Sequence, residues 1–352
     1  MVLPEEIPAL GEPLRAARKQ WAGDDLAKGE ERVKWFGVIL LACVGLAFYR
    51  GLATAQEAGL AVGVKSVLAS ENSGIALLMF TIFAFIPWYQ ARKEQAALST
   101  WTAERLAASV PGIRLETWLE GQKAPIHKGL LGLIGGVAIA QLLARDHPGG
   151  SASWFAIFQN WGGIEEAGLV KANYFSGEYW RLFTAPLMHG NIVHLLMNGS
   201  AMLYLGRRLE VLAGWPHLVM VFLFAGCAGG IASAHFVAAP TVGASGGLMG
   251  WLGFLLVFET LHHALVPLRS RKRLAAGVVV TALIGLVGYR FIDNAAHLGG
   301  LLGGMVYAAI VFPKSSSGKR PLATLADRLT GAAGLLVLFT AAAAACIKIL
   351  SE

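Results

Sequence analysis

Residues 241–251 read Thr-Val-Gly-Ala-Ser-Gly-Gly-Leu-Met-Gly-Trp. Ser245 stands among small residues, at the start of an apolar run that ends near Leu261. Further along the chain, a second apolar run begins with Ala-Ala-His-Leu-Gly-Gly over 295–300. Polar side chains inside a bilayer cost a few kcal/mol and tend to mark function. A serine and a histidine, each at the mouth of its own apolar segment, therefore call for an explanation.

The composition is that of a membrane protein. The chain has 352 residues, of which 55% are hydrophobic and 14% charged, and its mean hydropathy is +0.57. A soluble protein is typically about 25% charged. Several segments of about 18 or more residues carry almost no charge, which indicates transmembrane helices. We therefore expect an all-α polytopic membrane protein that contacts the lipid bilayer.

The apolar runs predict nine membrane spans, at 35–52, 75–89, 129–144, 186–205, 217–237, 245–261, 275–287, 295–312 and 331–349. Residues 54–74 and 92–128 are more polar connections, and 146–184 form a long polar and aromatic one. Long loops of this kind tend to be functional.

Basic residues predict the orientation. They collect before the first span, between the second and third, and after the fourth, sixth and eighth. The opposite loops carry few positive charges, such as Lys65, then Lys171 and Arg181, and none stands in the loop before Ser245. Since lysine and arginine gather in cytoplasmic loops, the N-terminus is predicted to be cytoplasmic and Ser245 and His297 to share the outer side. The same rule accounts for the net charge of +7, so no nucleic-acid partner is expected.

Three features limit the remaining possibilities. Cys43, Cys227 and Cys346 lie in separate apolar runs without a metal-ligand spacing, so neither a disulfide nor a metal or other cofactor is expected. The polar first 34 residues contain no early apolar run typical of a signal peptide. Acidic residues there favour a bacterial plasma membrane over a mitochondrion.

Ser245 has two interpretations. Residues 243–247 fit the G-x-S-x-G pattern of α/β-hydrolases, but that motif needs a preceding strand, and here the context is helical. A serine at a helix N-terminus could still act as a nucleophile, because free backbone N–H groups there can stabilise an oxyanion. The alternative is that the small residues serve close helix packing.

His297 favours the chemical interpretation. A serine hydroxyl is a weak nucleophile until a base accepts its proton, and histidine is the usual base near neutral pH. Gly300 and Gly304 are one turn apart and would let a neighbouring helix approach. Asp293 could orient His297 as a third member, or cap the helix that follows.

A second group of polar residues lies in Met-His-Gly-Asn-Ile-Val-His-Leu-Leu-Met-Asn over 188–198. His194 and Asn198 are four apart and share one helix face. Both could donate hydrogen bonds to an oxyanion, or they could join helices for stability. His189 is expected at the outer mouth of the span.

Taken together, these motifs resemble the rhomboid intramembrane serine proteases over about residues 129–313. The resemblance implies a Ser245–His297 dyad, and an oxyanion and substrate site formed with His194, Asn198, Gly243 and Ala244. It also matches Trp180-Arg181 to the family's first long loop and Glu210 to a structural acid. Met249 stands where the family often has an aromatic ring that stacks on the histidine, so it is included in the predicted site.

The resemblance also divides the chain. It implies a cytoplasmic arm (1–34), two additional spans (35–91), a cytoplasmic linker (92–128), a six-helix catalytic core (129–313) and a basic loop with one further span (314–352). The implied partners are single-pass transmembrane substrates, and the oligomeric state is open. The alternative is a proteolytically silent relative that binds membrane proteins, a class that lacks the serine or the histidine. A transporter would need charges at the midplane of several spans and an internal repeat, and neither is seen.

Overall fold

The computed structural model describes residues 7–351 apart from 69, 98–101, 145–160 and 290–291. Most of the described residues are helical, and one isolated β-bridge joins Leu169 and Thr241. They divide into two compact units, 1–114 and 115–352. The division falls within the predicted linker 92–128, part of which forms helix α5 (Ala103–Gly121).

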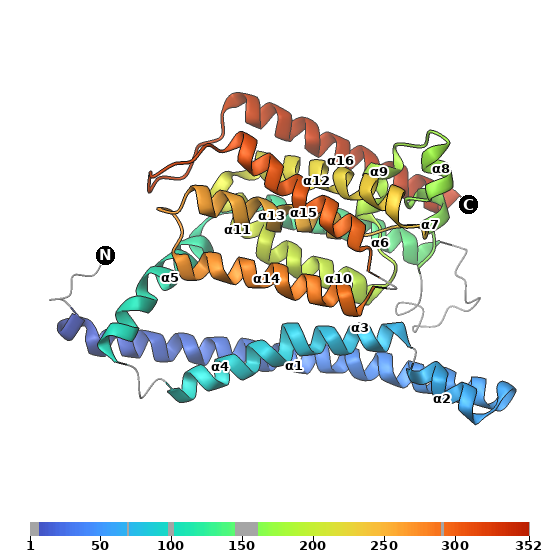
Figure 1. Ribbon diagram of the computed structural model, residues 1–352, viewed down its shortest axis with the longest axis horizontal. Helices are drawn as coiled ribbons and strands as arrows, with labels where there is room; N and C mark the ends of the chain where they lie inside the picture. Colours follow the sequence, from blue (N-terminus) through green and yellow to red (C-terminus); the bar gives the residue numbers. More distant parts are fainter. Residues whose placement is uncertain (1–6, 69, 98–101, 145–160, 290–291, 352) are drawn as a thin grey trace. The chain divides into compact units, whose positions relative to one another are not determined.

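The first unit is a helical hairpin. Helix α1 (Ile7–Ala58) packs against α2 (Leu60–Leu68), α3 (Glu71–Met79), the π-helical turn η2 (Phe80–Phe85) and α4 (Ile86–Ala97). Figure 1 shows these segments returning along α1. A β-carbon on Gly63 would lie 2.5 Å from the Gly51 carbonyl oxygen, so these two glycines allow α1 and α2 to touch. The predicted arm and first span are thus one continuous helix, and the loop expected over 54–74 is largely helical.

The second unit carries the helices of the predicted core, 129–313, and the one further span predicted after it. They are α6 (Ile126–Leu143), α10 (Ile192–Ala201), η6 (Met202–Gly206), α11 (Arg207–Ala213), α12 (Trp215–Phe236), α13 (Ser245–Leu261), α14 (Leu268–Val287), α15 (Asn294–Val311) and α16 (Leu325–Ser351). Between α6 and α10 lie the short helices α7 (Ile164–Ala167), α8 (Lys171–Phe175), α9 (Arg181–Thr184) and η5 (Ala185–Leu187). The described part of the long connection is therefore structured.

Five helices among the described residues are long and apolar enough to cross a membrane. They are α1 from Lys19 onward, α6, α12, α15 and α16, and α13 is equally apolar but shorter. The protein is therefore an all-α polytopic membrane protein, as its composition predicts. The count of nine spans stays a prediction.

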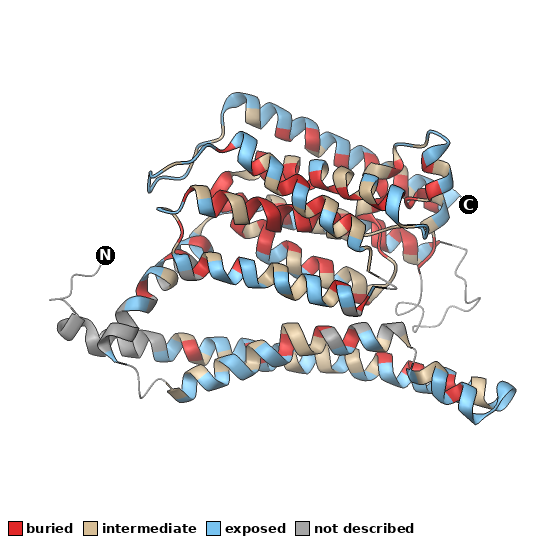
Figure 2. Ribbon diagram, in the orientation of Figure 1, coloured by how far each residue is buried: buried red, intermediate tan, exposed pale blue. Residues whose placement is uncertain are grey.

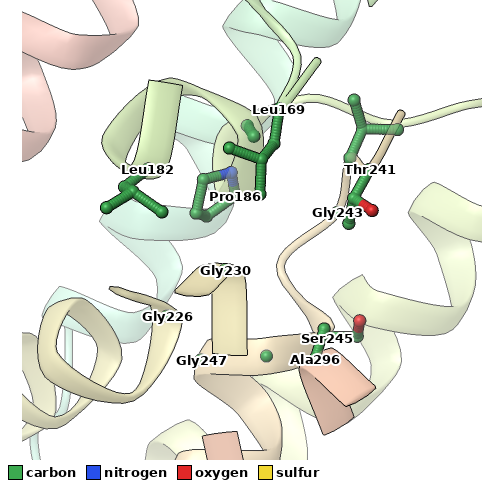
Figure 3. A pocket seen from close by; sticks show the side chains of 13 residues that line it. Leu169, Leu182, Pro186, Gly226, Gly230, Thr241, Gly243, Ser245, Gly247 and Ala296 are labelled. Carbon is green, nitrogen blue, oxygen red and sulfur yellow. The ribbon is translucent and has the colours of Figure 1, made fainter. Parts of the chain in front are cut away.

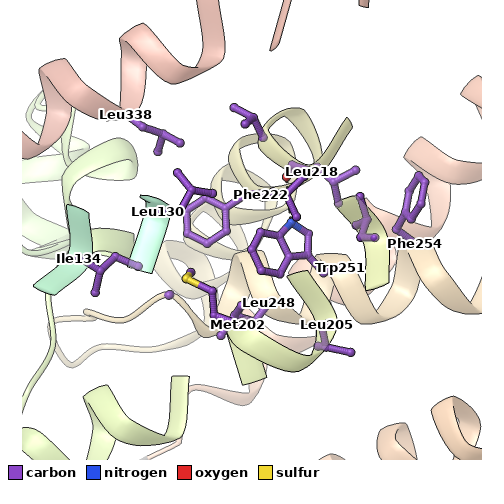
Figure 4. Close-up of a cluster of buried hydrophobic side chains, with 14 of the residues drawn as sticks. Leu130, Ile134, Met202, Leu205, Leu218, Phe222, Leu248, Trp251, Phe254 and Leu338 are labelled. Carbon is purple, nitrogen blue, oxygen red and sulfur yellow. Dashed lines mark hydrogen bonds between the residues drawn. The ribbon is translucent and has the colours of Figure 1, made fainter. Parts of the chain in front are cut away.

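Helix α13 is the centre of the second unit. It is apolar on all sides, as expected for a helix surrounded by others, and most of its residues are buried (Figure 2). Trp251 is fully buried, packs 5.6 Å from Phe222 between ring centroids, and donates its indole N–H to the Leu218 carbonyl oxygen at 2.9 Å. Figure 4 shows Met202, Leu130 and Leu248 around the same ring. This packing fixes α13 against α12, η6 and α6.

Glycines set the register between α13 and α15. A β-carbon on Gly300 would overlap the Gly246 carbonyl oxygen, and one on Gly304 would overlap that of Gly250. Both pairs advance by one turn, so the two helices run parallel and in backbone contact (Figure 1). Their N-terminal ends, which carry Ser245 and His297, consequently lie at the same end of the unit.

This packing predicts that an alanine substitution destabilises the protein at Gly304 but not at Gly135. Gly304→Ala is expected to destabilise the protein by about 1–3 kcal/mol, because the new methyl group has no room against Gly250. Gly135→Ala in α6 is the control, since a β-carbon there meets nothing within 4 Å and alanine favours helix by up to about 1 kcal/mol. Thermal unfolding in detergent micelles measures both. Equal melting temperatures for the two variants would contradict the proposed contact.

Candidate active site

The two residues with the strongest sequence signal occupy equivalent places on their helices. Ser245 is the first residue of α13, and His297 lies in the first turn of α15, where its N–H donates to the Asp293 carbonyl oxygen at 3.0 Å. Both side chains are half-buried. The first N–H groups of a helix have no partner within it, so the start of α13 offers donors beside the Ser245 hydroxyl.

The start of a third helix, α10, lies near Ser245 and His297. His194 lies in the first turn of α10, whose N-cap Asn191 accepts the His194 N–H at 2.9 Å. His194 is close enough to His297 for the charges of the two rings to interact. The structure thus brings His194 and His297 together at the end where α13 begins.

Gly243 connects this histidine to the serine segment. Its φ of 122° belongs to a region that favours glycine. A β-carbon there would lie 2.6 Å from Cε1 of His194, 2.7 Å from its Nε2, and 3.4 Å from Nδ2 of Asn198. The Gly243 N–H donates to the Ala185 carbonyl oxygen at 3.0 Å. The backbone two residues before Ser245 therefore runs directly past the two predicted oxyanion donors.

Asn198 is buried, and one of its amide hydrogens is already used. Its Nδ2 lies 2.9 Å from Nε2 of His189, and the His189 and His194 rings meet edge to face with centroids 5.0 Å apart. His189 precedes the start of α10, as expected for a residue at that end of the span, and its side chain is fully buried. Gln141 on α6 holds its backbone, accepting from the His189 N–H at 2.9 Å and donating to the carbonyl oxygen at 3.0 Å.

Two further residues of the predicted site, Ala244 and Met249, make only contacts within the helix or the hydrophobic core among those described. Ala244 is fully buried and is the N-cap of α13, accepting from the Leu248 N–H at 3.0 Å. Met249 is 9% exposed and belongs to the main hydrophobic cluster. Its stacking on His297 stays a prediction.

A small cavity lies beside Ser245 (Figure 3). Its volume of about 20 Å³ is enough for about one water molecule. Apart from Ser245 and Thr241, its walls are apolar or glycine, from the first loop, η5, α12, α13 and α15. The cavity can hold a small group next to the serine.

The predicted loop residues Trp180 and Arg181 brace the segment over the site. Arg181 is 4% exposed and donates to the carbonyl oxygens of Glu165 at 2.9 Å and Gly168 at 2.7 Å, and to the Glu178 carboxylate at 2.6 Å. Its guanidinium also lies 4.7 Å from the Trp180 ring centroid. Arg181 therefore ties α7 and the turn at Glu178 to α9.

Glu210 performs the structural role that the resemblance implied for it. Its carboxylate accepts from the backbone N–H groups of Ile126 and His127, both at 2.9 Å, and lies 2.8 Å from Nδ1 of His127. A carboxylate at this place compensates the free N–H groups at the start of α6.

Asp293 caps α15, one of the two roles left open for it. Its Oδ1 accepts from the Ala296 N–H at 2.8 Å. Its other oxygen accepts from the hydroxyls of Ser233, at 2.5 Å, and Thr241, at 2.8 Å. Its bonds therefore go to the helix start and to these hydroxyls.

Part of the chain is similar in sequence to proteins of one known family. Residues 176–314 match the family model of the Rhomboid domain. The chain is 37% identical over 155 residues to the rhomboid protease GluP of Bacillus subtilis (strain 168), covering 42% of this chain and 30% of that protein. It is 31% identical over 154 residues to RHOMBOID-like protein 4 of Arabidopsis thaliana, covering 44% and 38%. It is also 32% identical over 145 residues to Inactive rhomboid protein 1 of Homo sapiens, covering 40% and 17%.

The chain is a multi-pass, all-α integral membrane protein. The starts of three of its helices carry a serine and two histidines at one end of the second unit. Within that class, residues 176–314 are similar to the Rhomboid domain. The chain spans less than half the length of each of these three relatives, one of which is a protease and one of which is inactive.

Proposed function

We propose that this protein is an intramembrane serine endopeptidase that cleaves transmembrane segments with a Ser245–His297 dyad. The observation that carries the proposal is the parallel packing of α13 on α15, because it brings the two helix starts together. Similarity to a protein named as a rhomboid protease supports it.

The proposed reaction is acyl transfer. Ser245 attacks the substrate carbonyl carbon while His297 accepts the hydroxyl proton and then gives it to the leaving amine. The oxyanion is held by His194, by the remaining Asn198 hydrogen and by the N–H groups at the start of α13. Water then attacks the acyl-enzyme, with His297 as base, and frees Ser245. Irregular backbone and water are tolerated at this depth because protein surrounds them.

The proposed substrates are single-pass membrane proteins, and the proposed location is a bacterial plasma membrane with the N-terminus in the cytoplasm. The distribution of basic residues supports this orientation, which places Ser245 toward the outer face.

Labelling by a fluorophosphonate tests the nucleophile directly. The purified full-length protein in detergent is expected to form a covalent adduct at Ser245, identified by mass spectrometry of the peptide. Ser200→Ala should label as the wild type does, since that hydroxyl is exposed and bonds only to the Leu196 carbonyl oxygen among the described contacts. A folded wild-type protein without an adduct would refute the proposal.

A second candidate is a silent relative that binds membrane proteins without cutting them. The match to an inactive rhomboid protein favours it. Both Ser245 and His297 are present, however, whereas the silent class lacks one of them. Substrate co-purification without labelling would identify this case.

A further inference from the structure

Lys171 is a buried lysine with all its donors in use. It begins α8 and is 8% exposed. Its ammonium donates to the Leu169 carbonyl oxygen at 3.3 Å, to Ser233 Oγ at 2.9 Å and to Thr241 Oγ1 at 2.5 Å. An ammonium has three N–H groups, so these three bonds satisfy it completely. A lysine buried this far normally has a reason to be there.

The two hydroxyl partners of Lys171 also form hydrogen bonds to a carboxylate. Ser233 and Thr241 each accept from the ammonium and each donate to Oδ2 of Asp293. Each hydroxyl has a single hydrogen, so in this arrangement both hydrogens face the carboxylate. Lys171, Ser233, Thr241 and Asp293, here named the Lys171 cluster, thus join an ammonium to a carboxylate through two hydroxyls.

The Lys171 cluster connects the segments that lead into both reacting residues. Thr241 lies four residues before Ser245, and its backbone pairs with Leu169 through two hydrogen bonds, at 2.9 and 3.2 Å. Asp293 lies four residues before His297, and its carbonyl oxygen accepts the His297 N–H. Ser233 adds the end of α12.

We propose that Lys171 is a positioning residue that holds Asp293, and with it the first turn of α15, in register with the segment before Ser245. This inference rests on the proposed protease function. Lys171 does not touch the reacting atoms. It acts through Asp293 on His297 and through Thr241 on Ser245.

The charge of Lys171 is what orients the hydroxyls. A neutral amine has a lone pair, so one hydroxyl can turn toward it and release Asp293. Burial lowers the pKa of Lys171 to about 8, and the nearby Asp293 opposes that shift. The other ionisable groups on the neighbouring elements are Glu165 and Glu166 on α7, Tyr174 on α8, Glu178 and Arg181 at the start of α9, His235 at the end of α12 and His297 on α15. Proteolysis should therefore weaken as pH rises through about 8.

Lys171→Met tests the inference, because methionine resembles a neutral lysine in length. At pH 7 the variant is expected to lose roughly tenfold in kcat with little change in KM, since positioning acts on the transition state. Its activity should lack the alkaline fall of the wild type, so that the two profiles converge above pH 9. Lys314→Met, which removes an exposed lysine outside the Lys171 cluster, should keep both the rate and the alkaline fall.

Hydrogen–deuterium exchange gives a readout that does not need catalysis. The first turn of α15 should exchange faster in Lys171→Met, with the Lys314→Met variant unchanged. A wild-type kcat in Lys171→Met, a lower kcat that keeps the alkaline fall, or unchanged exchange over 294–297 would each overturn the inference. A variant that fails to fold is replaced by Lys171→Gln under the same criteria. If the wild type itself does not cleave or label, the proposed function fails, and the exchange experiment still decides whether Lys171 holds α15.

Discussion

Replacing Ser245 with alanine is expected to abolish cleavage of a transmembrane substrate in liposomes, and replacing His297 with alanine is expected to do the same. Each change removes one half of the proton transfer that makes the hydroxyl a nucleophile. The loss should exceed about 10³-fold in kcat, since removing one member of such a catalytic unit costs nearly as much as removing all of it. The measurement is the rate of product formation at saturating substrate.

The double variant distinguishes a dyad from two independent contributions. If the residues act as one unit, Ser245→Ala combined with His297→Ala should be no slower than either single variant. His263→Ala is the control, because His263 is exposed and follows the far end of α13 from Ser245. Melting temperatures must stay close to that of the wild type. Cleavage retained by either single variant would exclude the dyad.

The sequence predicted best those elements whose apolar runs are bounded by polar residues or glycine. Helix α13 begins and ends where its apolar run does, at Ser245 and Leu261. Helix α1 was predicted only in part, because its polar first half carries no apolar signal and yet continues the same helix. The prediction of a loop over 54–74 was wrong, because composition alone cannot distinguish a short, weakly apolar helix from a connection.

The site was predictable as a set of motifs, and less so as a set of contacts. Glycine spacing in α15 indicated that a helix would pack there, and the structure assigns α13 as that helix. The partnership of His189 with Asn198 could not be inferred, because helical spacing describes one face of one helix and His189 precedes α10.

One signal could have located the Lys171 cluster. Lys171 and Arg181 are two of the few basic residues in loops predicted to lie outside, where the positive-inside rule disfavours them. Both are buried, and both bind backbone carbonyl oxygens of the first loop. The two basic residues that depart from the positive-inside rule are therefore cations buried inside the protein. Their partners were hidden, since they come from α12, from residue 241 and from the start of α15.

Asn198→Ala is expected to lower kcat by about 10²–10³-fold with KM little changed. An oxyanion donor acts on charge that develops only in the transition state, which is why the loss falls on kcat. Asn198 is suited to the role because its amide has two hydrogens, one directed to His189, and because Nδ2 lies beside Gly243. The remaining hydrogen is the one available to a substrate oxygen.

Two further variants separate this role from simple support of His189. Asn198→Asp keeps the shape but replaces the donor with a negative acceptor, so it should be at least as slow as Asn198→Ala. His189→Ala removes the buried partner and leaves the Asn198 hydrogens free, so it should cost less than Asn198→Ala if the amide serves the oxyanion. Ser200→Ala on the same helix should retain the wild-type rate, because its hydroxyl is exposed. Equal losses in His189→Ala and Asn198→Ala would instead make Asn198 a support for His189, and would leave His194 and the start of α13 as the oxyanion donors.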